Sequence, residues 1–243
     1  MAVTERADAL LVARGLCDSR EQAKRLIMAG EVRYGTERVA KPSTKLPLEA
    51  ELTVVQRPRF VGRGGLKLEG ALDAFEIDPS GLVCLDLGAS TGGFTDCLLQ
   101  RGAQRVHAVD VGTNQLAWKL RQDPRVVSKE KFNARNLVEA DLGERVDLVV
   151  MDLSFISLTK VLPAAFGVLR EGGSVVCLIK PQFELSKGEV GKGGIVREPG
   201  LRDKAVESIR AFVTGDLRRE WRGVIASPIT GADGNVEFLA WLA

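Results

Sequence analysis

The sequence predicts an α/β protein: a Rossmann-like, mostly parallel sheet with an antiparallel edge, preceded by a small α+β domain. Strand-like apolar runs alternate with helical patterns along most of the chain, which is typical of a parallel sheet covered on both faces. The N-terminal part lacks that alternation, and 243 residues leave room for one ordinary domain and a small one. We therefore expect a small module over 1–57, a linker over 58–64 and a larger domain over 65–243.

The small module is expected to hold two short helices followed by three short strands. An apolar helical face runs from Ala7 to Ala13, and Ser19 is a good N-cap for a second helix that ends before Gly30. Valines at 32 and 39 and the apolar run at 52–55 indicate the strands. Pro58 restricts the residue before it, and the region around it lacks periodicity, as expected of a linker.

The larger domain is expected to alternate strands with helices and to end in an antiparallel pair at the sheet edge. Apolar runs predict parallel strands at 83–87, 105–111, 126–128, 146–152 and 174–180. Helical spacing predicts helices at 65–75, 95–101, 158–169 and 201–214. The candidates for the antiparallel pair are the segments 223–227 and 236–242.

Composition excludes several classes of protein and of site. The chain is 45% hydrophobic and 27% charged, as in ordinary globular proteins, and no apolar run approaches the ~20 residues that span a bilayer. We therefore expect a cytoplasmic protein with no membrane partner. A single histidine, His107, excludes sites that need several, so we expect no bound metal and a packing role for His107. No C-x-x-C pair occurs among the four cysteines, Cys17, Cys84, Cys97 and Cys177.

A glycine-rich turn follows the first expected strand of the larger domain. In the stretch VCLDLGASTGGF, Gly88 and Gly92 permit a tight turn and close approach to a ligand, and Gly93 lets the following helix pack close to the sheet. Asp110 ends the next strand, where a carboxylate suits the two hydroxyls of a ribose. Asp86 would repel a pyrophosphate but would bind the cationic amino-acid end of S-adenosylmethionine, directly or through water. The pattern favours adenosylmethionine, with a nicotinamide or flavin dinucleotide and a purely structural turn as the alternatives.

Two further strand ends carry residues capable of chemistry. Asp152 ends one expected strand, and Lys180 ends the apolar run VVCLI. Ligands of open parallel sheets bind at the carboxyl ends of the strands, so both side chains are expected on the same side as Asp86 and Asp110. Burial lowers the pKa of a lysine, which can let it serve as a general base. The alternative is that Lys180 only pairs with a structural carboxylate.

Six stretches together resemble the TlyA family, bacterial ribosomal RNA methyltransferases that are related to FtsJ and often labelled hemolysins. They span nearly the whole chain in order: RADALLVARGLCDSREQAKRLIMAGEV with KPS at 41–43, GRGGLKLEGAL, DLGASTGGFTD, VDLVVMDLSFISL, LIKPQFE and GNVEFL. The resemblance implies an N-terminal RNA-binding module of the type shared with a ribosomal small-subunit protein and tyrosyl-tRNA synthetases. It also implies a catalytic Lys-Asp-Lys-Glu tetrad, which maps onto Lys67, Asp152, Lys180 and Glu237.

Taken with this resemblance, the turn and the strand ends give a set of expected cofactor contacts. These are Asp86, Gly88, Ala89, Ser90, Gly92, Gly93, Phe94, Asp110 and Asp152. Without the resemblance, Lys67 would be expected on the surface and Glu237 on an edge strand. One departure concerns the hairpin of the RNA-binding module, where family members commonly carry an Asn-Gly turn and this chain has Tyr34-Gly35-Thr36.

The reaction that the resemblance implies is methylation of a ribose 2'-hydroxyl, for which cytidine is the family's substrate. The hydroxyl must lose a proton, and the enzyme must align it with the methyl group. Our hypothesis is that Lys180 is the base and that Lys67 orients the hydroxyl and lowers the pKa of Lys180 by repulsion. Asp152 and Glu237 would hold the two lysines and balance their charge.

Basic residues are the expected contacts for ribosomal RNA within a ribosomal subunit. Residues 1–60 hold 11 Lys and Arg against 8 Asp and Glu, a net charge of +3, whereas the rest of the chain has a net charge of −1. Each basic residue alone is equally consistent with a solvated surface. Because aromatic residues make up only 5% of the chain, we expect readout of RNA shape rather than a stacking platform. The expected phosphate contacts are Arg14, Arg20, Lys24 and Arg25 on the two helices and Arg57, Arg59 and Arg63 in the linker.

Two other functions stay open. One is a membrane-permeabilising hemolysin, which the common family label suggests and which the lack of an apolar spanning run disfavours. The other is a ribosome-binding factor with an inactive methyltransferase fold, which the complete tetrad and glycine turn disfavour. The sequence predicts no oligomeric state. The glycine-rich segment 186–197 is expected to be a mobile loop over the pocket.

Overall fold

The computed structural model describes residues 3–55 and 58–243 of the chain. The chain divides into two compact units, Met1–Pro58 and Arg59–Ala243, which are described one at a time. Arg57, one of the expected RNA contacts, lies outside the described residues.

The N-terminal unit packs two helices against short antiparallel strands. Helices α1 (Ala7–Ala13) and α2 (Arg20–Met28) are the two that were predicted, and the Ser19 hydroxyl accepts a hydrogen bond of 3.2 Å from the Gln22 amide as an N-cap. A three-stranded sheet has the order β3-β2-β5. Its strands are β2 (Val32–Tyr34), β3 (Glu37–Arg38) and β5 (Leu52–Val54).

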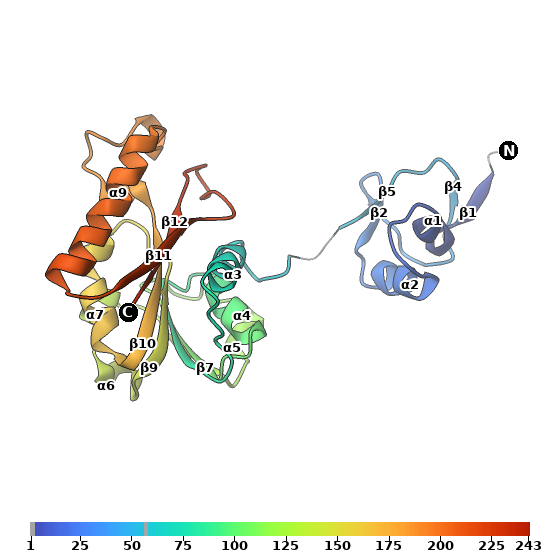
Figure 1. The fold of residues 1–243 in the computed structure, drawn as a ribbon. Helices are drawn as coiled ribbons and strands as arrows, with labels where there is room; N and C mark the ends of the chain where they lie inside the picture. Colours follow the sequence, from blue (N-terminus) through green and yellow to red (C-terminus); the bar gives the residue numbers. More distant parts are fainter. Residues whose placement is uncertain (1–2, 56–57) are drawn as a thin grey trace. The chain divides into compact units, whose positions relative to one another are not determined.

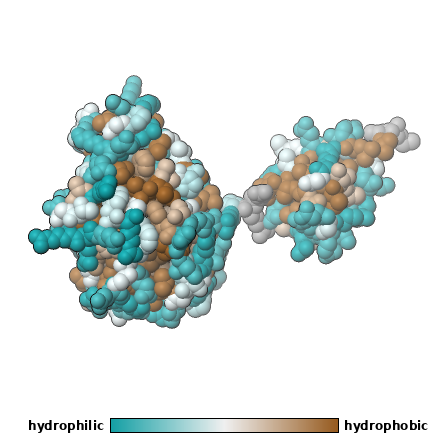
Figure 2. All heavy atoms as spheres, in the orientation of Figure 1, coloured by the Kyte–Doolittle hydropathy of each residue, from teal (hydrophilic) through white to brown (hydrophobic). Residues whose placement is uncertain are grey.

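Two strands of this unit were not predicted from the sequence. Strand β1 (Thr4–Arg6) pairs antiparallel with β4 (Lys45–Pro47). Both are short, and most of their residues are exposed or half-buried, so neither carries the alternation of apolar residues from which a strand can be predicted. Figure 2 shows hydrophobic residues among hydrophilic ones on the visible face of this unit, and Met28, Leu48 and Val55 are exposed.

The larger unit is built on one seven-stranded sheet of order β11-β12-β10-β9-β6-β7-β8, which confirms the predicted fold class. Strand β12 runs antiparallel to both of its neighbours, and the pairs from β10 to β8 are parallel, so the predicted antiparallel edge is confirmed. The strands are β6 (Val83–Leu87), β7 (Arg105–Val109), β8 (Val126–Lys129), β9 (Val146–Met151), β10 (Leu169–Ile179), β11 (Trp221–Ala226) and β12 (Phe238–Leu242).

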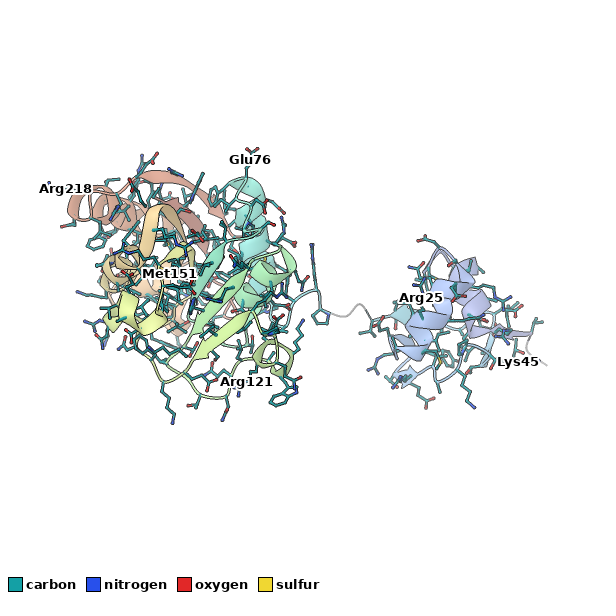
Figure 3. The ribbon with its side chains drawn as sticks, turned by 90° about the horizontal axis from the view of Figure 1, so that it is seen from below. Arg25, Lys45, Glu76, Arg121, Met151 and Arg218 are labelled. Carbon is teal, nitrogen blue, oxygen red and sulfur yellow. The ribbon has the colours of Figure 1, made fainter. Side chains whose placement is uncertain are left out.

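Helices cover both faces of this sheet and create two hydrophobic cores (Figure 1). One face carries α3 (Gly64–Ala74), α4 (Gly93–Gln100) and α5 (Trp118–Arg121). The other carries α6 (Glu139–Leu142), α7 (Leu162–Gly167) and α9 (Pro199–Ala211). Met151, labelled inside the sheet in Figure 3, is fully buried at the end of β9. Strands buried on both faces explain the continuous apolar runs of the sequence.

Several predicted boundaries differ from the structure, and the largest difference lies at the start of β10. A single helix was predicted over 158–169, but a 3₁₀ turn (Leu158–Lys160) precedes α7, which ends at Gly167. Strand β10 then begins at Leu169 rather than Ser174, because Leu169 already pairs with Val146 before a bulge interrupts the ladder. Gly172, with φ of +76°, lies in that bulge, where a left-handed conformation favours glycine.

Candidate active site at the carboxyl ends of the strands

A cavity of about 550 Å³ lies where β6, β9 and β10 end. Lys67, Asp152, Lys180 and Glu237 all line it, although they come from four separate parts of the sequence. The remaining wall includes the turn at 62–64, the glycine-rich turn after β6 and the connections that follow β9, β10 and β11. The structure therefore brings together the four residues of the expected tetrad.

Adjacent parallel strands place Asp152 beside Lys180. Asp152 follows β9, and Lys180 follows β10 at the start of α8 (Pro181–Glu184). The Nζ of Lys180 lies 2.7 Å from Oδ1 of Asp152 and donates a hydrogen bond of 2.9 Å to the hydroxyl of Ser154. The backbone amide of Asp152 donates to the carbonyl of Leu87 at 3.0 Å, which holds the strand end against β6.

Lys67 and Glu237 form a second ion pair across the cavity wall. Lys67 lies on α3 and Glu237 directly before β12, and the Nζ of Lys67 is 2.5 Å from Oε2 of Glu237. Only 9% of the lysine side chain and 3% of the glutamate side chain are exposed. Burial of both charges rules out the alternative of a surface lysine and an exposed edge carboxylate, since ions this far from water need a partner.

The glycine-rich turn permits close approach of backbone segments. Gly88 has φ of +84°, and a Cβ there would overlap the backbone oxygen of Asp152, so the ends of β6 and β9 approach closely only with glycine at this position. A Cβ on Gly93 would lie 2.9 Å from the amide nitrogen of Gly65. Gly93 therefore makes room for the first turn of α3 and the residue Gly62 before it.

Asp86 is fully buried beneath the glycine-rich turn rather than in the cavity wall. Its Oδ2 accepts hydrogen bonds from the amide and the hydroxyl of Thr95 at 2.9 and 2.7 Å, which fixes the first turn of α4. Its Oδ1 has no hydrogen-bond partner in the described structure. Burial raises the pKa of Asp86 to about 7, and repulsion from Asp152 and Asp110 adds to the shift.

Asp110 holds the other side of the same turn. Its two carboxylate oxygens accept from the backbone amides of Ser90 at 2.8 Å and Gly112 at 2.6 Å. A second, small cavity of about 10 Å³ lies beside it, and Ala89 and Ser90 line both cavities. Ser90 has φ of +49°, so the turn bends sharply between the two cavities.

An aromatic pair stands at the wall of the larger cavity. The rings of Phe155 and Phe183 lie 5.2 Å apart between centroids at an angle of 51°. Phe155 is 91% exposed and has φ of +63°, which is unusual for a bulky residue. Phe155 follows β9 and Phe183 lies in α8 after β10, so two neighbouring strand ends bring together two aromatic residues of a chain that has few.

Some of the predicted RNA contacts have partners within the protein, and others are exposed. Arg14 donates to the carbonyl of Leu48, and Arg20 lies 3.2 Å from the buried carboxylate of Asp8. Arg59 pairs with Glu69 at 2.6 Å. Lys24, Arg25 and Arg63 are exposed, and Arg63 lines the cavity. Figure 3 shows Arg25, with its label, on the N-terminal unit.

Several other expectations concern groups outside the cavity. His107 is buried in β7, with its Nε2 3.1 Å from Oε1 of Glu144, which agrees with the predicted packing role. Within 3–55 and 58–243, no three His, Cys, Asp or Glu side chains gather closely enough to hold a metal ion. In the same ranges, no helix combines the length and apolar character needed to cross a membrane.

Comparison with known proteins adds two family matches and several relatives. The FtsJ-like methyltransferase family matches residues 60–243, and the S4 domain matches residues 5–52. The 16S/23S rRNA (cytidine-2'-O)-methyltransferase TlyA of Mycobacterium tuberculosis is 52% identical over 244 residues, covering 100% of this chain and 91% of that protein. A hemolysin-named structure from Streptococcus thermophilus is 47% identical with a TM-score of 0.75, covering 100% of this chain and 89% of its own.

A more distant structure shares the fold alone. The S-adenosylmethionine-dependent methyltransferase of Mesorhizobium loti is 17% identical, with a TM-score of 0.51 over 74% of this chain and 99% of its own.

Proposed function

Since this chain belongs to the TlyA family of FtsJ-like methyltransferases, we propose that it methylates a ribose 2'-hydroxyl of cytidine in ribosomal RNA. The observation that carries the proposal is the cavity on which the Lys180–Asp152 and Lys67–Glu237 pairs converge beside a glycine-rich turn. We place the enzyme in the cytoplasm with its ribosomal substrate. The RNA-binding module comprises 1–57, the linker 58–64 and the methyltransferase domain 65–243.

The residues around the turn fit S-adenosylmethionine as the cofactor. The unpartnered Oδ1 of Asp86 is a buried acceptor that the ammonium group of the cofactor, or a water bound to it, would satisfy. When bound, the cofactor supplies a methyl group on a sulfonium, which is a good leaving group. Asp110 would hold the ribose hydroxyls, and the backbone of the turn would hold the rest, through Gly88, Ala89, Ser90, Gly92, Gly93 and Phe94.

The chain's own residues would remove the proton of the ribose hydroxyl and align its oxygen with the methyl group. Lys180 takes the proton from the ribose hydroxyl at Nζ, and Asp152 and Ser154 fix the position of that nitrogen. Lys67 donates to the hydroxyl oxygen from the opposite pair, with Glu237 holding it in place. Alignment matters as much as the base, because displacement of a reacting group by about 1 Å can cost about 10²-fold in rate.

The exposed aromatic pair supplies a surface for the nucleobase. Phe155 and Phe183 offer ring faces at the cavity wall, against which the base of the target nucleotide would stack. Stacking of a base on an aromatic side chain contributes about 1–3 kcal/mol. The S4 domain, with Lys24 and Arg25 exposed, would bind the RNA backbone.

Methylation of isolated ribosomal subunits tests the proposal. We expect unmodified small or large subunits, incubated with labelled adenosylmethionine and the full chain, to gain label on the 2'-oxygen of a defined cytidine. Mapping of alkali-resistant linkages locates it. Label on a base, or none on either subunit, would refute the proposal, and release of dye from liposomes by the pure protein would favour the hemolysin alternative.

The raised pKa of Asp86 predicts a pH-dependent affinity for the cofactor. Only the carboxylate form attracts the ammonium group, so below pH 7 affinity should fall by up to about tenfold per pH unit, given a pKa of about 7. Asp86→Asn should bind more weakly at pH 8 and show a flatter profile. Calorimetric titration from pH 6 to pH 8 measures both. The cofactor's own amino group titrates equally in the two experiments, so parallel profiles would contradict the role of Asp86.

A further inference from the structure

A buried asparagine joins two segments of the cavity wall. Asn235 lies in the connection between β11 and β12, two residues before Glu237, and only 1% of it is exposed. Its Oδ1 accepts a hydrogen bond of 2.9 Å from the amide of Val196, and its Nδ2 donates one of 2.9 Å to the carbonyl of Gly194. Gly194 and Glu237 both line the cavity, so the side chain of Asn235 ties one part of the wall to the other.

The two hydrogen bonds specify an asparagine. A backbone amide only donates and a backbone carbonyl only accepts, so the orientation of the Asn235 amide is fixed by its partners. An aspartate would lose the donor and face a carbonyl oxygen with a carboxylate. An apolar side chain of similar size would leave the buried amide of Val196 and the partly buried carbonyl of Gly194 without this partner, which is costly.

The backbone of Asn235 makes a further contact, with Gly231, whose lack of a side chain leaves space for Glu237. The carbonyl of Asn235 accepts a hydrogen bond of 2.8 Å from the amide of Gly231. A Cβ on Gly231 would lie 2.6 Å from Oε1 of Glu237, so this turn folds directly against the glutamate carboxylate. The other oxygen of Glu237 holds Lys67 at 2.5 Å. A shift of Asn235 therefore reaches the Lys67–Glu237 pair through Gly231.

The segment that Asn235 holds is anchored rather than free along its length. Val196 is buried, and its carbonyl accepts a hydrogen bond of 2.9 Å from Nε of Arg202 on α9. Upstream, Glu189 pairs with Lys204, also on α9. The glycine-rich segment is thus held to α9 at Glu189 and at Val196, and Gly193 and Gly194, which lie between these two residues, line the cavity. Asn235 holds the same segment at Gly194 and Val196.

We propose that Asn235 is a positioning residue for methyl transfer, which acts by coupling the segment at 191–196 to the alignment of Glu237 and Lys67. Asn235 itself is not among the residues that line the cavity. The inference rests on the proposed function for its kinetic consequence, whereas the coupling itself is a property of the protein without substrate.

Asn235→Ala tests the inference against Arg202→Ala as the matched control. The Nε of Arg202 donates a hydrogen bond to the same residue, Val196, but Arg202 lies on α9 rather than in the connection that carries Glu237. We expect Asn235→Ala to lower kcat for methylation of ribosomal subunits by about 10- to 100-fold, as expected for a misaligned reacting group. The KM for adenosylmethionine should change by less than about twofold, because the glycine-rich turn at 88–93 belongs to other segments. Arg202→Ala should leave kcat within about threefold of the unchanged protein. If Asn235→Ala does not fold, Asn235→Ser takes its place.

Hydrogen exchange gives a readout that needs no activity. In the Asn235 variant the amide of Gly231 should exchange faster, although its partner is the backbone rather than the replaced side chain, and the amide of Thr95 should not change. Wild-type kcat in the variant, equal kcat losses in both variants, or unchanged exchange at Gly231 would overturn the inference. Absence of methylation by the unchanged protein would refute the proposed function instead, and the exchange result would still decide the coupling.

Discussion

Lys180→Met should reduce methylation of ribosomal subunits by about 10²- to 10⁴-fold, the range over which a general base contributes, while the affinity for adenosylmethionine stays nearly unchanged. Methionine keeps the length of the side chain but removes the nitrogen that lies 2.7 Å from Asp152 and 2.9 Å from Ser154. The cofactor turn follows β6, two strands away from β10 in the sheet, so its backbone should hold its shape. Single-turnover rates and calorimetric titration measure the two quantities.

Lys180→Arg separates the base from the charge. Arginine retains a cation beside Asp152 but is not deprotonated in proteins, so it cannot accept the proton, and we expect it to be as inactive as the methionine variant. Lys204→Met is the matched control, because Lys204 also pairs with a carboxylate but lies on α9 and is well exposed. Substantial turnover by Lys180→Arg would assign Lys180 a purely electrostatic role.

One part of the site follows from general rules of sheet geometry. Asp152 and Lys180 each follow a buried apolar run, and parallel neighbouring strands end at the same edge, so their proximity was predictable from the sequence. The structure places the two charged groups 2.7 Å apart, directly after β9 and β10. The same rule located Asp86 and Asp110 at this edge. It did not reveal that Asp86 lies beneath the turn, because burial depends on how α4 packs over the strand end.

Other parts of the site have no signal in local pattern. Lys67 lies inside a helix and Glu237 directly precedes β12, and only family resemblance joined residues so far apart in the sequence. Phe155 and Phe183 were not predicted as site residues, because two aromatic residues far apart in the sequence form no motif until the fold brings them together. Asn235 is a single polar residue in a loop, and its role is evident only from the two backbone groups that it satisfies.

Glu237→Ala should both destabilise the protein and abolish its activity, because it leaves the buried ammonium group of Lys67 without its partner. Removing one member of a buried ion pair typically costs about 3–5 kcal/mol of the free energy of unfolding, and both side chains here are nearly inaccessible to water. Glu139→Ala, which breaks the exposed pair with Arg145, is the control and should cost no more than about 1 kcal/mol. Urea denaturation measures both.

A double variant, Lys67→Met with Glu237→Leu, separates stability from chemistry in this pair. Apolar residues of similar volume in place of a buried ion pair are often neutral or stabilising, so we expect the free energy of unfolding to return close to that of the unchanged protein. Methylation should stay absent, since Lys67 no longer donates to the ribose hydroxyl. If the double variant regains activity with its stability, the pair serves the fold alone. Stability restored without turnover would show instead that two buried charges are retained at the cavity for the reaction.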